Sequence, residues 1–259
     1  MKLLKILLEQ EKILVPRRIK GRPEKHLKAI QQKIQQYIKD GSKGNLDLHG
    51  TPIKSLPDNL KSVGGDLGLS DTPITSLPDN LKYVGGNLDL EETPITSLPD
   101  NLKYVGGNLK LQDTPIKSLP DKLEYVGGNL SLFNTPITSL PNNLKYVGGN
   151  LYLKGTRITS LPDNIEIRGD LWLVSLRISS LPNNLKVGGT LALAGTPIKS
   201  LPDNLEIGKS LLLQDTPITS LPDNLKVRVD LYIENSALAK KYTDEEIRNL
   251  ADIGGDIIR

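Results

Sequence analysis

The chain has 259 residues and a formal net charge of +3 at pH 7, and only 37% of its residues are hydrophobic and 4% aromatic. This composition is too poor in apolar side chains for one large spherical core, and it favours a thin layered core of Leu, Ile and Val. The chain has no Cys, which excludes a disulfide scaffold and thiolate chemistry, and its two His leave little room for imidazole catalysis.

The first 43 residues are predicted to form a helical N-terminal cap. Residues 2–12 and 24–40 carry apolar side chains at helical spacing, and Gly41 is a typical helix stop. In the second helix these side chains are Leu27, Ile30, Ile34, Tyr37 and Ile38. The basic stretch 16–25 is interpreted as a solvated connector, and contact with nucleic-acid phosphate or anionic lipid is the alternative.

No part of the sequence predicts a membrane span or a secretion signal. The apolar start of the chain is interrupted by Lys5 and ended by Glu9, and no run approaches the roughly 20 apolar residues of a membrane helix. We therefore expect a soluble, cytoplasmic protein.

Residues 44–236 hold ten near-copies of one unit of 20–21 residues, typified by the segment GGNLDLEETPITSLPDNLKYV. The first Leu of each Leu-x-Leu lies at positions 46, 67, 88, 109, 130, 151, 171, 191, 211 and 231. The step is 21 residues at first and 20 later. Comparison of the units predicts that the shorter ones lack the Tyr of Leu-Lys-Tyr-Val, as in Leu185-Lys186-Val187.

Each unit has a pattern that predicts one turn of a solenoid. Leu88 and Leu90 alternate with polar residues, which is typical of a short strand. The chain then turns at residues 93–95, and Pro99 favours an extended backbone over residues 98–102. The pair Gly106–Gly107 is expected to adopt positive φ angles and to lead into the next strand. One unit cannot bury its own apolar face, so neighbouring units must stack.

The Leu-x-Leu, Ile and Leu-Pro-x-x-Leu positions resemble those of the leucine-rich-repeat family, in its short bacterial type, and similar repeats are associated with tailed phages. The resemblance implies a β-rich solenoid, a right-handed superhelix with a parallel concave sheet and an extended, polyproline-like convex side. The family usually has Asn after the strand, whereas this chain mostly has Thr there, as at Thr93. A hydroxyl ladder is expected to replace the amide ladder in part.

Residues 237–259 are predicted to form a C-terminal cap, which consists of a helix and a final strand. Thr243 and Glu246 have the spacing of a capping box, and residues 253–257 repeat the sequence pattern that precedes each strand. Both ends of the solenoid are thus expected to be covered, since unpaired sheet edges promote aggregation.

The residues that vary between units indicate where a partner binds. In the second half of the chain the variable positions in and after Leu-x-Leu become aromatic and apolar, and Arg twice replaces the turn Pro. The candidate partner-binding residues are Phe133, Tyr152, Arg157, Trp172, Val174, Arg177, Leu212 and Tyr232. Trp, Tyr and Arg dominate binding hot spots. Neutral drift at solvent-facing positions is the alternative.

Two further columns have plainer interpretations. Acidic residues gather on the same face of the first half, where they form a solvated surface or contact a basic partner, and a cation site is the alternative. The residues concerned are Asp47, Asp71, Asp89, Glu91, Glu92 and Asp113, with His49. The column Tyr83, Tyr104, Tyr125 and Tyr146 is interpreted as a packing ladder, with a ligand-stacking platform as the alternative.

The sequence therefore predicts a non-enzymatic scaffold that binds a protein on the aromatic half of its concave face. No catalytic residue, metal, cofactor or nucleic acid is expected, and a monomer is expected. The alternative is a structural component of a virion or homo-oligomer that uses the same patch as a self-interface.

Overall fold

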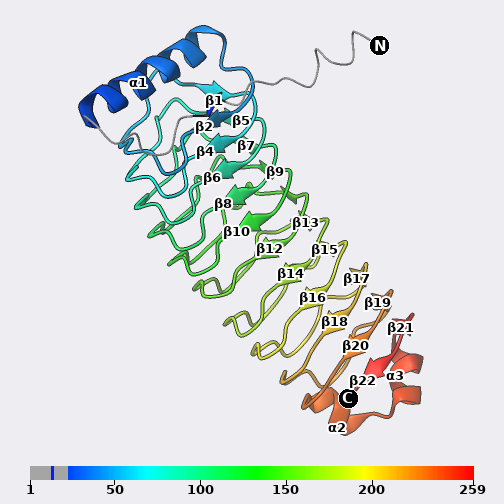
Figure 1. Cartoon of the computed structure of the whole chain (residues 1–259). Helices are drawn as coiled ribbons and strands as arrows, with labels where there is room; N and C mark the ends of the chain where they lie inside the picture. Colours follow the sequence, from blue (N-terminus) through cyan, green and yellow to red (C-terminus); the bar gives the residue numbers. More distant parts are fainter. Residues whose placement is uncertain (1–12, 15–22) are drawn as a thin grey trace, which may run out of the picture.

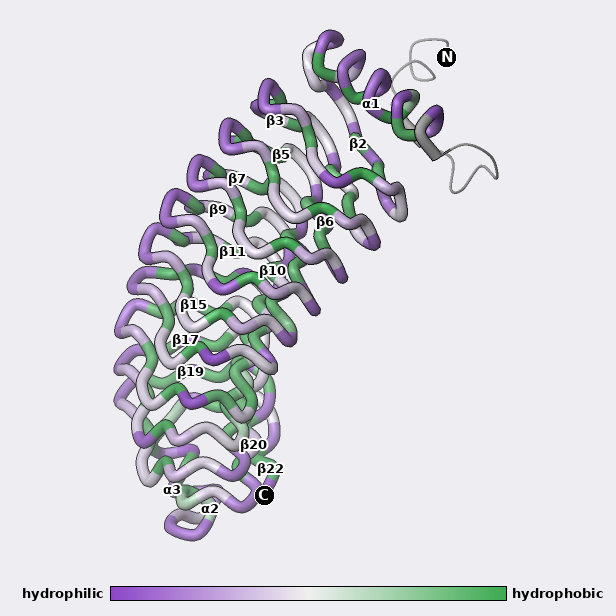
Figure 2. Tube along the Cα trace, turned by 90° about the vertical axis from the view of Figure 1, so that its left-hand side faces the viewer, coloured by the Kyte–Doolittle hydropathy of each residue, from purple (hydrophilic) through white to green (hydrophobic). Residues whose placement is uncertain are grey.

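The computed structural model describes residues 13–14 and 23–259, and the expected helix over residues 2–12 lies outside them. The chain winds into an elongated stack of similar turns, in which each turn adds one strand to each of two parallel sheets (Figure 1). Figure 2 shows that the stack bends along its length. The predicted β-rich solenoid is confirmed, and it contains a second sheet that the sequence did not predict.

Sheet A is formed by the Leu-x-Leu segments. Within the described residues its strands, in spatial order, are β1 (Ile13–Leu14), β2 (Leu46–Asp47), β4 (Leu67–Gly68), β6 (Leu88–Asp89), β8 (Leu109–Lys110), β10 (Leu130–Ser131), β12 (Leu151–Tyr152), β14 (Leu171–Trp172), β16 (Leu191–Ala192), β18 (Leu211–Leu212), β20 (Leu231–Tyr232) and β22 (Ile257–Ile258).

Sheet B is formed by the residues five and four positions before each sheet A strand from β4 onward, and in most repeats a Gly-Gly pair follows them. Its strands are β3 (Ser62–Val63), β5 (Tyr83–Val84), β7 (Tyr104–Val105), β9 (Tyr125–Val126), β11 (Tyr146–Val147), β13 (Glu166–Ile167), β15 (Lys186–Val187), β17 (Glu206–Ile207), β19 (Lys226–Val227) and β21 (Asp252–Ile253).

The core consists of the repeated aliphatic positions stacked from turn to turn. In one turn both Leu of Leu-x-Leu, the Ile of Thr-Pro-Ile and the Leu after Asp-Asn are fully buried, as at Leu88, Leu90, Ile95 and Leu102. Equivalent side chains lie one strand spacing apart, about 4.8 Å. The core is therefore thin in cross-section and continuous along the stack, as the composition indicated.

The Thr that follows each strand does not form a ladder between turns. Its hydroxyl donates to the carbonyl of the Leu three residues earlier, as in Thr93 Oγ1 to Leu90 O at 2.7 Å, and it is buried there. This bond closes the turn within its own repeat. The expected hydroxyl ladder is therefore wrong.

An amide ladder does join the turns, but it lies before the strand. The backbone N–H of Asn108 donates to Asn87 Oδ1 at 2.7 Å, and Asn129 N–H donates in the same way to Asn108 Oδ1. The same bond recurs, with Asp in place of Asn in some turns, from Asn45 through Asp66 and Asn150 to Asp170. The ladder pairs backbone donors that the stacked turns would otherwise bury unsatisfied.

The Gly-Gly pairs are required for close packing rather than for positive φ angles. A Cβ placed on Gly106 would lie 2.0 Å from the carbonyl oxygen of Gly85. The positive φ angles instead fall on the residue before the turn Thr, such as Glu92 at 56°. The prediction that Gly106–Gly107 adopts positive φ is therefore wrong, because the limit there is the approach of the next turn's backbone.

The shorter repeats keep the strand position of the Tyr. In sheet B, Tyr146 pairs with Glu166 and Val147 with Ile167, so Glu166 occupies the Tyr position. The missing residue belongs to the turn before the strand, where Asn164 takes a φ of 60°. The prediction that the shorter repeats lack the Tyr position is therefore wrong. Pairing between the strands of sheet B fixes their register, so the one-residue deletion falls in the turn.

Helices cover the described ends of the stack (Figure 1). Helix α1 (Pro23–Lys39) buries Ile30, Ile34 and Tyr37 against the first turns, which agrees with the predicted amphipathic helix. At the other end α2 (Ala237–Lys241) and α3 (Asp244–Leu250) replace the irregular segment of the last full turn, and α3 has the predicted capping box. The predicted final strand is present as β22.

Candidate binding surface

The second residue of each sheet A strand points away from the core, because side chains alternate along a strand. We call the outer surface formed by these residues and their alternate neighbours the sheet A face. The pairing register places them in one line along the stack: Asp47, Gly68, Asp89, Lys110, Ser131, Tyr152, Trp172, Ala192, Leu212, Tyr232 and Ile258.

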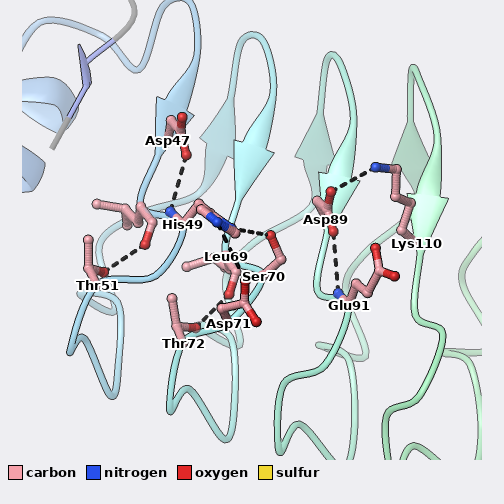
Figure 3. Close-up of polar contacts among 11 residues, drawn as sticks. Asp47, His49, Thr51, Leu69, Ser70, Asp71, Thr72, Asp89, Glu91 and Lys110 are labelled. Carbon is pink, nitrogen blue, oxygen red and sulfur yellow. Dashed lines mark hydrogen bonds and ion pairs between the residues drawn. The ribbon is translucent and has the colours of Figure 1, made fainter. Parts of the chain in front are cut away.

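The first half of the sheet A face is polar and internally paired (Figure 3). Lys110 Nζ lies 2.9 Å from Asp89 Oδ2, and this hydrogen bond raises the pKa of the lysine. His49 Nδ1 lies 2.7 Å from Ser70 Oγ, and its Nε2 lies 3.4 Å from Asp71 Oδ2. These contacts give the acidic cluster internal partners.

No group of three or more His, Asp or Glu side chains that could hold a metal ion occurs among residues 13–14 and 23–259. The acidic residues of the first half are spread along several turns rather than gathered around one point. The alternative of a cation site therefore has no support in the described part of the chain.

The second half of the sheet A face is apolar over consecutive strands. Trp172 has 36% of its surface exposed, and Tyr152, Leu212 and Tyr232 are half-buried. Ala192 lies in the same line but is fully buried, so larger neighbours on the face cover it. The register that pairs Trp172 with Ala192 and Ala192 with Leu212 places those two side chains on either side of it. We call Tyr152, Trp172, Ala192, Leu212, Tyr232 and Ile258 the apolar strip.

Ile258 extends the apolar strip by one strand, and sequence reasoning missed it. It pairs with Tyr232 and is half-buried. The signal was available, since the pattern around residues 253–257 predicted a further strand, but the residue after that pattern was not assigned to the face.

Phe133 and Val174 flank the apolar strip. Phe133 lies two residues after Ser131, and Val174 lies two residues after Trp172, so both are on the same outer surface. Both side chains are half-buried. The ammonium group of Lys154 lies 5.9 Å from the centre of the Phe133 ring, within cation–π range. Asn150 donates through Nδ2 to the Tyr152 hydroxyl at 2.7 Å, which ties this ring to the amide ladder.

Arg157 and Arg177 lie beside the sheet A face rather than on it. Each is exposed and follows the turn after its strand, at the position that is Pro in most other repeats. The two arginines line one hollow of about 520 Å³ with Thr159 and Ser175. The structure therefore divides the predicted residues between a strip on the sheet and a hollow at the neighbouring turn.

The Tyr column forms a continuous stack on sheet B. The ring centres of Tyr83, Tyr104, Tyr125 and Tyr146 are 4.6–4.8 Å apart, and the planes are within 8° of parallel. Each inner ring has its faces covered by its neighbours, so the inner rings cannot stack on a ligand. This arrangement agrees with the packing ladder. In the later repeats the same position of sheet B alternates between acidic and basic residues: Glu166, Lys186, Glu206 and Lys226. Lys226 Nζ lies 2.7 Å from Glu206 Oε1.

Among the described residues, no helix is both long enough and apolar enough to cross a membrane.

The solved structures that resemble this one are leucine-rich-repeat proteins. YopM, a leucine-rich effector protein of Yersinia pestis, superposes with a TM-score of 0.51 at 19% identity, over 84% of this chain and 67% of YopM. A leucine-rich-repeat protein of Leptospira interrogans (17% identity, 83% of this chain and 96% of that one) and YopM of Yersinia enterocolitica (15%, 91% and 86%) give TM-scores of 0.24 and 0.23, too low to support an argument.

The chain thus has the leucine-rich-repeat fold, which it shares with the bacterial protein YopM. It matches no protein-family model, and no curated protein sequence is significantly similar to it. At this level of identity the likeness establishes the fold alone, and the resemblance to phage proteins stays a prediction.

Proposed function

We propose that the chain is a non-enzymatic scaffold that binds a protein partner on the apolar strip of the sheet A face. The observation that carries this proposal is the run of apolar side chains on consecutive strands, from Tyr152 to Ile258, within which Trp172 is 36% exposed. Contiguous exposed apolar surface rimmed by polar residues is typical of interaction sites.

The chemistry of the strip supports protein binding better than catalysis. Trp and Tyr provide large rigid contact areas, and they are enriched at the centres of protein interfaces. The strip itself contains no titratable group other than the Tyr hydroxyls, so it offers no nucleophile or general base of the usual kinds. YopM, which has the same fold, is described as an effector protein, which fits a binding role.

The test is a double substitution, Trp172→Ala with Tyr152→Ala. Both side chains point out of the core, so the thermal midpoint is expected to change little, while capture of the partner from an extract of the source cells is abolished. The matched control is Tyr83→Ala, which removes a ring with 42% exposure from sheet B and should leave capture unchanged.

The opposite results would contradict the proposal. Capture that survives the double substitution would place the partner elsewhere, and global unfolding would show that the two rings belong to the core. Light scattering over a concentration series tests the self-interface alternative: a mass that rises with concentration, and falls back in the double variant, would favour assembly over scaffolding.

A further inference from the structure

Arg157 and Arg177 form a pair of adjacent cations that lacks counter-ions. Strands β12 and β14 are neighbours in sheet A, and each Arg lies five residues after the second residue of its strand. The two side chains thus start about one strand spacing apart. No carboxylate of the described chain forms an ion pair with either guanidinium. Two neighbouring cations repel each other, so the arrangement favours binding of an anion.

The repeats that hold the arginines have no acidic residue at the position just before the turn, whereas some other repeats have one there. One residue per repeat takes a positive φ before the turn; it is Gly50 in the first repeat and acidic in the second to fourth repeats, at Asp71, Glu92 and Asp113. In the next four repeats the same position holds uncharged residues, and Asp returns only at Asp215. These four are Asn134, Gly155, Ser175 and Gly195. An anion near the arginines would therefore meet no carboxylate at this position.

The hollow lined by the two arginines has room and donors for a tetrahedral oxyanion. It measures about 520 Å³, and its lining includes Arg157, Arg177 and hydroxyl side chains beside Ile158 and Leu176. The hydroxyl proton of Thr156 is used, since it donates to Leu153 O at 2.7 Å. Thr159 and Ser175 are both exposed and supply the further hydroxyl donors. Guanidinium groups bind phosphate oxygens through paired, charge-assisted hydrogen bonds.

We propose that Arg157 and Arg177, with the hydroxyls of Thr159 and Ser175, form an oxyanion site that binds a phosphate monoester on a side chain of the protein partner. The oxyanion site rests on these residues alone, and its assignment to the partner rests on the proposed function. Tyr152 and Trp172 belong to the same two repeats. One partner segment can therefore cover the rings and place a phosphorylated side chain in the hollow.

A phosphorylated side chain fits this site better than a nucleic acid or a membrane. Both of those ligands require basic residues spread over an extended surface. Here the equivalent position is Pro in the repeats on either side, at Pro136 and Pro197, so the basic surface at this position ends after two turns. One phosphate group is what two guanidinium groups can neutralise.

The first experiment uses inorganic phosphate and O-phosphoserine as probes, titrated into the full chain and followed by the NMR signals of the Arg side-chain N–H groups. Both probes should shift the signals of Arg157 and Arg177 in a saturable way, whereas chloride at equal ionic strength should not. In Arg157→Gln with Arg177→Gln the affinity should fall by about tenfold or more, since charged hydrogen bonds are lost.

The matched control is Lys54→Gln with Lys117→Gln, which removes the same charge. Lys54 and Lys117 are exposed, and neither repeat is a neighbour of the two arginine repeats, so phosphate affinity should stay unchanged. An equal loss in both variants, or no saturable shift in the wild-type chain, would overturn the oxyanion site.

The second experiment tests the source of the phosphate. Phosphatase treatment of the source-cell extract should weaken capture by the wild-type chain and have no effect on the residual capture by the Arg double variant. Capture that depends on Trp172 but is insensitive to phosphatase would overturn the partner assignment and leave the proposed function standing. Arginine-dependent binding of anionic vesicles or single-stranded DNA without binding of O-phosphoserine would also overturn it.

Discussion

The side chain before most sheet A strands stabilises the contact between neighbouring turns. Asn129 Oδ1 accepts the backbone N–H of Asn150 at 2.7 Å, while the Asn129 N–H donates to Asn108. Some turns use Asp at the same position, for example Asp66, which accepts from Asn87 at 2.7 Å. What the position requires is therefore an acceptor oxygen at the end of a short side chain.

We predict that Asn129→Ala lowers the free energy of unfolding by about 1–3 kcal/mol, because a partly buried backbone N–H loses its acceptor. Asn129→Asp keeps the oxygen and should cost much less. The measurement is the shift of the thermal midpoint, with Asn143→Ala as a control: the Asn143 side chain makes an exposed bond to Asp121 O. Equal effects of Ala at 129 and 143 would show that the ladder does not hold the turns together.

The two Gly of the pair illustrate what residue-level reasoning can and cannot give. Most repeats have Gly-Gly between sheet B and sheet A, and two physical reasons for this preference compete: a positive φ, or the absence of a side chain. Only the neighbouring turn decides, since a Cβ on Gly127 would lie 2.0 Å from Gly106 O. The sequence of one repeat does not contain that distance.

Among the elements, the Tyr stack of sheet B is the regular aromatic feature. Burial raises the pKa of Tyr104 above the usual 10.0, and the neighbouring Tyr125 and Tyr83 raise it further. An unfolded Tyr therefore loses its proton at lower pH than the folded one. The stabilisation is fully present below the pKa of the unfolded Tyr and is lost as the pH rises through the folded pKa.

We predict that wild-type chain loses more stability than Tyr104→Phe between about pH 9 and pH 12, because Phe has no proton to lose. Denaturation curves at several pH values measure this difference. Lysines lose their protons over the same range in both proteins, so the comparison removes their contribution. Parallel pH profiles would mean that the stack does not oppose ionisation of Tyr104.

Elements with a strong internal pattern could be predicted from the sequence, and those fixed by pairing could not. The strand at Leu88 and Leu90, helix α1 and the capping box at Thr243 each follow from local spacing. The second sheet did not, because strands such as Tyr104–Val105 are two residues long and carry no alternation of their own. For the same reason the position of the deletion near Glu166 was misread.

The candidate site was also predicted in part. The variable positions identified the aromatic residues, because exposed positions are free to differ between repeats while buried ones are not. The burial of Ala192 and the shared hollow of Arg157 and Arg177 could not be predicted, since both depend on how side chains from successive turns lie together.

At the scale of the whole molecule, the stacked turns separate stability from recognition. The repeated aliphatic side chains of the core point inward and are almost completely buried in every turn, whereas the sheet A face changes from polar pairs such as Lys110–Asp89 to the apolar strip. Because each turn contacts mainly its neighbours, substitutions on the face leave the stack intact. The described ends differ from the middle in having helices, which bury apolar side chains such as Ile34 and Ile247.

The most direct test of this account uses Trp172, which is the single Trp of the chain, so its fluorescence reports one position on the sheet A face. The account predicts that acrylamide quenches this fluorescence readily in the folded, partner-free chain and much less once the partner has bound. A blue-shifted emission that acrylamide cannot reach in the free chain would contradict it, because Trp172 would then be a core residue and the apolar strip would not be a surface.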